Sequence, residues 1–170
     1  MKSEILSVLN KKNMNNLLPI ANSQSPHDTR YMQLAIAEAQ KAYAMGEIPV
    51  GCVIVADNQV VGRGHNLTET LADVTAHAEM QAITAAANTI GGKYLSQCTI
   101  YVTVEPCVMC AGAIGWAQIR RVVFGTTDEK RGFTIFAPNA LHPKCTVSSG
   151  VLEAECRELM QSFFAQKRTK

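Results

Sequence analysis

The sequence contains few aromatic residues, little charge and no long apolar run. Only 6% of its 170 residues are aromatic, with a single tryptophan, and 18% are charged. The charges still interrupt the apolar stretches so often that none is suited to span a bilayer, and no membrane partner is expected. There is no internal repeat. With 47% hydrophobic residues, the composition is typical of a globular protein large enough to bury a core.

A strong net charge is also absent. Sixteen Lys and Arg stand against fourteen Asp and Glu, and a net charge of +2 is too small to identify a partner. The distribution says more, because nine Lys and Arg oppose five Asp and Glu from Arg120 onward, and the chain closes on Lys167-Arg168-Thr169-Lys170. Such a tail is commonly a solvated helix end, but it is also what a phosphate backbone attracts.

A secretory signal is lacking too. The apolar run within Met1–Leu9 is too short for one, so we expect a cytoplasmic, reducing environment in which the six cysteines form no disulfides. Cys52, Cys98 and Cys156 lie in apolar patterns and are expected to be buried. Cys145 lies among polar residues and is expected to be partly exposed.

The apolar pattern predicts one domain after a short extension. Residues 1–26 are rich in asparagine and other polar residues, and we expect them to be disordered, with a single domain over 27–170. The pattern then predicts, in chain order, a helix ending at Gly46, strands over 50–56 and 59–66, a helix over 76–89, a strand over 98–104, a helix from Cys107, strands over 121–124 and 144–148, and a final helix. Asp57-Asn58 suits a tight hairpin turn between the first two strands. This order predicts an α/β fold, a three-layer α/β/α sandwich with a mixed five-stranded sheet.

Two short motifs supply the strongest chemical signal. The first is His77-Ala78-Glu79, and the cysteine pair of the second, Pro106-Cys107-Val108-Met109-Cys110, begins thirty positions after the histidine (107 − 77 = 30). Cys107 and Cys110 are one helical turn apart, so both sulfur atoms can bind one ion, and His77 adds a ring nitrogen. Three protein ligands leave the fourth position of a tetrahedral zinc ion for water, as a catalytic site requires. The spacing therefore predicts one Zn²⁺ per chain.

Glu79 distinguishes a catalytic zinc site from a structural one. A carboxylate that is not a ligand can accept a proton from water and return it to a ring nitrogen and then to a leaving amine. Because residues two apart on a regular helix face different ways, His77 must lie at or before the first helical turn for Glu79 to reach the metal. Together the two motifs match the signature of zinc nucleobase deaminases.

The residues around both motifs resemble the bacterial tRNA-specific adenosine deaminases, within the cytidine and deoxycytidylate deaminase superfamily. The similarity covers roughly residues 30–168. Besides the metal residues it includes Gly46-Glu47-Ile48-Pro49-Val50-Gly51, Gly64-His65-Asn66, Thr75-Ala76-His77-Ala78-Glu79, Tyr101-Val102-Thr103-Val104-Glu105-Pro106-Cys107-Val108-Met109-Cys110-Ala111-Gly112 and Val122-Val123-Phe124-Gly125. Matches this long and ordered are more specific than the zinc pattern alone.

The resemblance implies a zinc hydrolase that converts the wobble adenosine of a tRNA anticodon to inosine and releases ammonia. It implies that Asn66 contacts the base, that the backbone N–H of Ala78 meets the ring, and that Asp128 lies near the bound nucleotides, where it can accept from a ribose hydroxyl. It further implies a homodimer that binds the anticodon stem-loop across the subunit boundary, with the small-residue helix after Cys110 as the expected interface. Phe163-Phe164 and the basic tail resemble the family's RNA-contacting carboxyl end.

The segment from Gly132 to Val147 departs from the family, whose members carry a longer segment there with a Gly-Ser-Leu step. The resemblance therefore defines the chemistry more closely than the substrate. Phe133 and Phe136 are either core residues or aromatic surfaces on which an anticodon base stacks. His142 is expected to be an ordinary loop residue.

Two other functions share the metal residues. A deaminase of a free base or nucleoside, of guanine or cytosine type, would use the same zinc ion and Glu79. A non-catalytic zinc-binding RNA module would have no need of Glu79. The presence of Asn66, Asp128 and the basic tail favours RNA over a small substrate.

Overall fold

The computed structural model of the chain describes residues 20–22 and 25–168. Its helices and strands are, in chain order, β1 (Ile20–Asn22), α2 (Pro26–Ala44), β2 (Gly51–Ala56), β3 (Gln59–His65), α3 (Ala78–Ile90), β4 (Thr99–Val104), α4 (Val108–Trp116), β5 (Arg121–Thr126), α5 (Phe133–Phe136), β6 (Thr146–Ser149) and α6 (Glu153–Arg168). Every helix and strand predicted for 27–170 is present. The stretch before β6, for which no element was predicted, contains the short helix α5.

The strands form one mixed sheet in the order β1-β6-β5-β4-β2-β3. Strand β2 is antiparallel to β3 and β4, whereas β4, β5 and β6 run parallel to one another. The five predicted strands are β2 to β6. Strand β1 adds a sixth at the sheet edge, parallel to β6, with Ile20 opposite Val147. It lies within the 1–26 extension, of which residues 1–19 and 23–24 are outside the described part of the chain.

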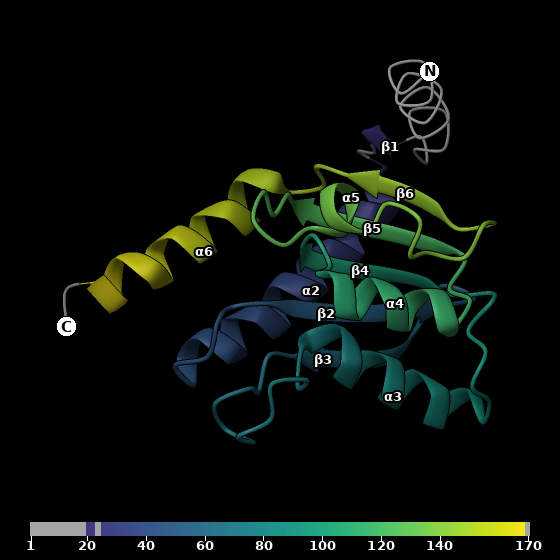
Figure 1. Cartoon of the computed structure of the whole chain (residues 1–170), viewed down its shortest axis with the longest axis horizontal. Coiled ribbons are helices and arrows are strands. Elements are labelled where there is room, and N and C mark those ends of the chain that lie inside the picture. Colours follow the sequence, from purple (N-terminus) through teal and green to yellow (C-terminus); the bar gives the residue numbers. More distant parts are fainter. Residues whose placement is uncertain (1–19, 23–24, 169–170) are drawn as a thin grey trace, which may run out of the picture.

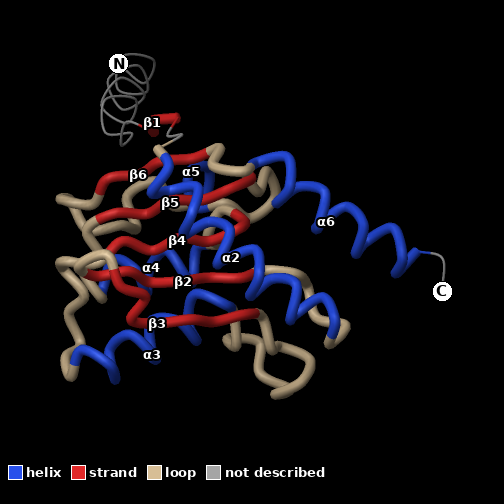
Figure 2. Tube along the Cα trace, turned by 180° about the vertical axis from the view of Figure 1, so that it is seen from behind, coloured by secondary structure: helices blue, strands red, loops and turns tan. Residues whose placement is uncertain are grey.

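Helices cover both faces of the sheet, as Figures 1 and 2 show from opposite sides. On one face, α3 and α4 pack over Ile54 and Val102 in a large apolar core. On the other, α2 and α6 pack over Val53 and Tyr101 in a second core. Neighbouring residues of a strand point to opposite faces, so each central strand contributes to both cores. This arrangement confirms the predicted three-layer sandwich.

The predicted hairpin is also present. Asp57 and Asn58 join β2 to β3, and their φ angles of 47° and 62° are both positive, as a type I′ turn requires. Two glycines then bring α3 close to β3. A side chain on Gly62 or Gly64 would collide with the backbone of α3 at Ala82. This close contact holds the amino end of α3 beside the residues that follow β3.

The remaining predictions concern cysteines and membranes. Cys52, Cys98 and Cys156 are buried as predicted. Cys145 is only 3% exposed, so its predicted exposure is wrong: it joins the apolar core beside β6 despite its polar neighbours in sequence. Among the residues of 25–168 that form helices, none makes a helix with both the length and the apolar composition needed to cross a bilayer.

Candidate active site

The two motifs meet at the amino ends of two helices. His77 is the N-cap of α3, and Cys107 is the N-cap of α4, to which β4 leads through Glu105 and Pro106. Both caps have an extended backbone, so neither residue is part of the regular helix. For Glu79 to reach the metal, His77 had to lie at or before the first helical turn. This is the case, because His77 precedes α3 and Glu79 belongs to its first turn. Helix amino ends carry partial positive charge, which favours thiolate and carboxylate groups.

The three predicted ligand atoms lie within binding distance of a single ion. The Nδ1 atom of His77 is 3.5 Å from Sγ of Cys110 and 3.7 Å from Sγ of Cys107, and all three atoms lie within 4.8 Å of one another. Tetrahedral zinc, with Zn–S of about 2.3 Å and Zn–N of about 2.0 Å, sets a sulfur-to-nitrogen distance of about 3.5 Å. The donor set and its spacing therefore fit zinc, with the ring nitrogen Nδ1 as the histidine ligand.

The thiols influence each other's protonation. A hydrogen bond with Cys110 is the main cause that lowers the pKa of the Cys107 thiol to about 4. The same hydrogen bond, with burial, raises the pKa of the Cys110 thiol. The pKa of His77 is raised, chiefly through its hydrogen bond with Cys107. Cys107 thus favours the thiolate, the form that binds metal, and the other two groups release their protons when a metal binds.

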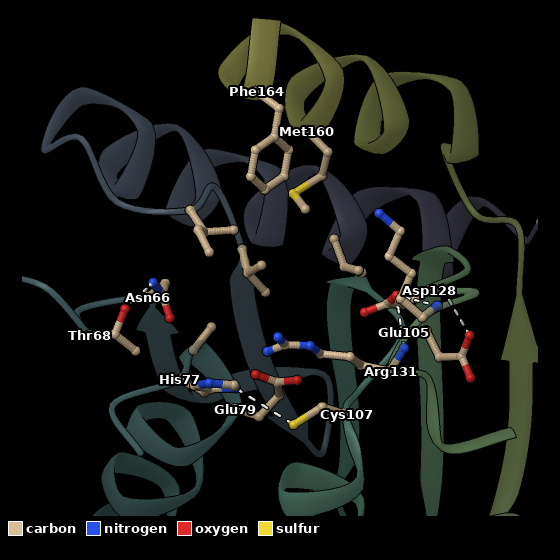
Figure 3. Close-up of a pocket in the computed structure, with 15 residues that line it drawn as sticks. Asn66, Thr68, His77, Glu79, Glu105, Cys107, Asp128, Arg131, Met160 and Phe164 are labelled. Carbon is tan, nitrogen blue, oxygen red and sulfur yellow. Dashed lines mark hydrogen bonds between the residues drawn. The ribbon is translucent and has the colours of Figure 1, made fainter. Parts of the chain in front are cut away.

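Glu79 lies beside this cluster with its carboxyl group buried. The residue is 3% exposed, and Figure 3 shows its side chain next to those of His77 and Cys107. Burial is the main cause that raises the pKa of Glu79 to about 7. A carboxyl group with this pKa exchanges protons readily at neutral pH, which is the property that a shuttle between water and substrate needs.

His77, Glu79 and Cys107 line a cavity of ≈ 460 Å³, a size typical of small-molecule sites. Cys110 is fully buried and does not line it. The cavity is lined by Ile48, Val50, Asn66, Thr68, His77, Ala78, Glu79, Val104, Glu105, Cys107, Asp128, Lys130, Arg131, Met160 and Phe164. The structure therefore brings the predicted substrate residues Asn66, Ala78 and Asp128 into one pocket with the metal ligands His77 and Cys107, although these residues come from separate parts of the sequence.

One wall of the pocket is formed by the residues that follow β3. The buried Asn66 donates from Nδ2 to Oε2 of Glu47 at 3.0 Å and to Oγ1 of Thr68 at 3.0 Å. Because the carboxylate of Glu47 can only accept, it fixes which end of the Asn66 amide faces it. Both N–H groups are used within the wall, so the carbonyl oxygen of Asn66 remains to accept from a ligand.

Glu47 holds the rest of this wall as well. It is 1% exposed and accepts from the backbone N–H groups of Thr70 at 2.7 Å and Glu69 at 3.2 Å. Burial acts to raise the pKa of Glu47, but hydrogen bonds from Thr70, Glu69 and Thr68 outweigh it, and the pKa lies below its ordinary value. Glu47 therefore stays ionised at neutral pH and fixes residues 66–70.

The opposite wall is the segment 128–134. Asp128 accepts through Oδ1 from the backbone N–H groups of Lys130 at 2.9 Å and Arg131 at 3.1 Å. Its own backbone N–H donates to Oε2 of the buried Glu105 at 3.0 Å. One oxygen of Asp128 thus shapes the segment, and the other is left for the ribose contact predicted for this residue.

The aromatic residues of the departing segment and of α6 have different roles. Phe133 is buried and packs edge-on against Phe124, with ring centroids 6.4 Å apart, so it is a core residue. Phe136 is 57% exposed and is absent from the pocket lining. In α6, Phe163 packs against Tyr43, whereas Phe164 lines the pocket.

The predicted loop residue His142 and the described tail residues Lys167 and Arg168 do not line the pocket. His142 accepts from the backbone N–H of Lys144 through Nδ1, as expected of a loop residue. Lys167 and Arg168 close α6, and Thr169 and Lys170 of the basic tail lie outside the described residues.

Sequence reasoning assigned no separate role to three residues that line or support the pocket. Glu47 and Glu105 were seen only as parts of longer similar stretches, and Arg131 was not singled out at all. An acidic residue among apolar neighbours, as in Val104-Glu105-Pro106, was an available signal, because a buried carboxylate must have partners. Nothing in the sequence indicated that Arg131 reaches the pocket.

Comparison with known proteins agrees with this geometry. The model of the cytidine and deoxycytidylate deaminase zinc-binding region matches residues 25–126. A tRNA-specific adenosine deaminase from Streptococcus pyogenes is 43% identical over 147 residues, which cover 84% of this chain and 92% of that protein. A structure from work on A-to-I editing by tRNA:A34 deaminases at the wobble position of transfer RNA is 41% identical, with a TM-score of 0.72, over 77% of this chain and 99% of that one.

A more distant structure shares the fold alone. Guanine deaminase from Nitrosomonas europaea is 20% identical, with a TM-score of 0.71, over 89% of this chain and 91% of that one. The family model covers more than half of the chain, and the relative from Streptococcus pyogenes is similar over nearly its whole length. The chain therefore belongs to the cytidine and deoxycytidylate deaminase family, among its tRNA-specific adenosine deaminases.

Proposed function

We propose that this protein is a zinc-dependent hydrolytic deaminase that converts the wobble adenosine of a tRNA anticodon to inosine. The observation that carries the proposal is the metal cluster with Glu79 beside it, in a chain 43% identical to a tRNA-specific adenosine deaminase over most of both lengths. In this reaction water supplies the oxygen that replaces the exocyclic amine of adenine, and the amine leaves as ammonia.

Each residue of the site has a part in that reaction. Zinc held by His77, Cys107 and Cys110 would lower the pKa of water and supply hydroxide near neutral pH. Glu79 would accept the first proton of water and pass it to a ring nitrogen of the base. It would then accept the second proton from the hydroxyl group added to the base and pass it to the departing amine, which leaves as ammonia. Its pKa of about 7 suits both directions of transfer.

The walls of the pocket would position the nucleotide. Asn66 offers its carbonyl oxygen, and Ala78 offers the backbone N–H of the first residue of α3, which has no acceptor within the helix. Asp128 has one carboxylate oxygen beyond the one that its own segment uses. These groups are placed to meet the edge of the base and the ribose around it.

The tRNA anticodon stem-loop is the proposed partner, bound by a homodimer. On α4 and the adjacent α5, large apolar side chains are left exposed: Val108, Met109, Trp116, Ile135 and Phe136. Apolar side chains gathered in this way are typical of a protein interface. Gly112 has open space around it, whereas Gly115 already packs against Ala140 of the same chain. Of the small residues predicted for the interface, Gly112 is therefore the better placed.

The homodimer can be tested by light scattering during size-exclusion chromatography. The wild-type protein should have the mass of two chains, and Trp116→Glu should shift it to one, because a charge would replace a large apolar side chain of the interface. Arg120→Glu alters an exposed residue beyond the end of α4 and should leave the mass unchanged. A monomeric wild type would refute the dimer.

The substrate is tested by measuring ammonia release. The protein is incubated with an anticodon stem-loop that bears a wobble adenosine and, in parallel, with adenine, guanine, cytosine and their nucleosides. Release from the RNA alone supports the proposal, and release from a free base or nucleoside supports the alternative. A protein that binds zinc but releases ammonia from no compound would be the RNA module. A tRNA substrate also fits the cytoplasmic location expected from the sequence.

A further inference from the structure

Arg131 places a positive charge in the pocket that neither the metal cluster nor the proton transfer uses. Its side chain lines the cavity, and Figure 3 shows it extending from the segment 128–134 across the pocket toward Asn66 and His77. Among residues 25–168, none accepts a hydrogen bond from its guanidinium or forms an ion pair with it. A guanidinium without an acidic partner in a substrate pocket is suited to an anionic group of the substrate.

The segment that carries Arg131 is fixed at both ends by one buried carboxylate. Glu105 is 3% exposed. Its Oε2 accepts from the backbone N–H of Asp128 at 3.0 Å, and its Oε1 accepts from the backbone N–H of Thr134 at 2.9 Å and the hydroxyl of Thr134 at 2.6 Å. Gly132 lies directly against the carboxylate, where any side chain would overlap it. Both oxygens of Glu105 are thus used to hold the segment.

The turn between these two ends sets the direction of Arg131. Asp128 accepts from the backbone N–H of Arg131 at 3.1 Å, and the backbone N–H of Phe133 donates to the carbonyl oxygen of Pro106 at 3.0 Å. The segment is therefore held against the same stretch, residues 105–107, that carries a zinc ligand. This fixes the backbone of Arg131 relative to the metal centre.

We propose that Arg131 binds a phosphate group of the substrate and that Glu105 is the positioning residue that directs it there. The inference rests on the proposed function and deepens it, because it requires a substrate that carries phosphate beside the base. A phosphodiester of RNA and the phosphate of a free nucleotide share this chemistry. A free base and a nucleoside lack it.

The first experiment replaces the cation and measures steady-state kinetics on the anticodon stem-loop. Arg131→Ala should raise KM about tenfold, leave kcat within about twofold and lower the slope of log affinity against log salt by about 1, the effect of losing one phosphate contact. Kinetics on any nucleoside that the wild type accepts should not change. Arg120→Ala, which removes the same charge from an exposed position outside the pocket, is the matched control and should have no effect.

The second experiment asks whether Glu105 acts through Arg131. Glu105→Gln should raise KM for the stem-loop by a similar factor, with kcat and zinc content unchanged, and should add little to the effect of Arg131→Ala when the two are combined. Glu47→Gln is the control, because Glu47 holds the opposite wall and not the segment of Arg131. Its effect on KM should therefore be independent, so that the two factors multiply when it is combined with Arg131→Ala. If Glu105→Gln does not fold, Thr134→Val carries the test, because it removes only one of the three hydrogen bonds to Glu105.

The outcomes separate this inference from the proposed function. The inference is overturned if Arg131→Ala leaves KM and the salt slope unchanged. It is also overturned if the effects of Arg131→Ala and Glu105→Gln on KM are fully independent. In both cases deamination of the stem-loop still stands. If the wild type deaminates nucleoside monophosphates rather than RNA, the proposed substrate is wrong, and the inference holds only when Arg131→Ala raises KM for the nucleotide and not for its nucleoside. Activity on free bases alone overturns both.

Discussion

Each half of the metal centre is built by residues that lie close together in the sequence, whereas the walls of the pocket are held by residues from elsewhere. His77 and Glu79 are two positions apart at the start of α3, and Cys107 and Cys110 are three apart at the start of α4. Glu47 reaches the wall at 66–70 across 19 to 23 positions, and Glu105 reaches the segment 128–134 across 23 to 29. The reaction is thus encoded locally, and the shape of the substrate site depends on long-range hydrogen bonds.

Removing a metal ligand should have the largest effect on activity. Cys107→Ser replaces a thiolate by a hydroxyl that binds zinc poorly, so zinc and deamination should both be lost. The wild type should hold one zinc ion per chain, as measured by elemental analysis of the purified protein. Cys156→Ser changes a buried cysteine in the other core and should keep the metal. A Cys107→Ser protein with full zinc content and normal turnover would show that the ligand assignment is wrong.

Glu79→Gln should separate chemistry from metal binding. The amide keeps the size of the side chain but cannot accept a proton, so turnover should fall by about 10²- to 10⁴-fold while zinc content and thermal unfolding stay as in the wild type. Single-turnover kinetics with the anticodon stem-loop measures the loss. Near-normal turnover in this variant would rule out Glu79 as the proton carrier.

The pH profile sharpens the same test. The pKa of Glu79 is raised to about 7, chiefly by burial. A protonated carboxyl group cannot accept a proton from water, and a zinc ion beside Glu79 favours its ionised form, so wild-type turnover should rise with pH at or below about 7 and then level off. Glu79→Gln, which does not titrate, should lack this rise. A variant that retained the full rise would assign the titration to another group.

Asn66→Ala should affect the wall without affecting the metal. The change removes the carbonyl oxygen that faces the pocket, so kcat/KM for the stem-loop should fall by about 10- to 100-fold, the range expected for one lost hydrogen bond to substrate. Zinc content should remain that of the wild type. Loss of zinc in Asn66→Ala would mean that the wall and the metal centre are not independent, and the contrast drawn between them would fail.

The same contrast explains which parts of the molecule could be predicted from the sequence. The zinc ligands and Glu79 were predictable because each pair is fixed by its spacing at a helix start. The strands β2 to β6 were predictable from their apolar patterns, whereas β1, at the sheet edge, has three residues and too short a pattern to detect. The roles of Glu47, Glu105 and Arg131 were not predictable, because they depend on which backbone N–H groups the fold brings to a buried carboxylate.

The smallest predicted effect is on stability in acid, and it concerns Glu47. Hydrogen bonds outweigh burial and lower the pKa of Glu47 below the 4.5 of an ordinary glutamate. A carboxyl group whose pKa is lower in the folded state stabilises the protein fully above the unfolded pKa and loses that contribution as pH falls through the folded one. The wild type should therefore lose part of its stability below about pH 4.5 through this residue.

Glu47→Gln cannot lose a contribution that depends on ionisation. Its Tm should be lower than that of the wild type by about 2–4 °C at pH 7, the shift that 1 kcal/mol causes in a protein of this size, and the difference should shrink as pH falls below 4.5. Scanning calorimetry of both proteins across pH measures it. Zinc is also lost in acid as its ligands gain protons, but the metal centre is the same in both proteins, so its contribution cancels in the difference. A Tm difference that stayed constant with pH would show that Glu47 holds the wall by shape alone rather than by charge.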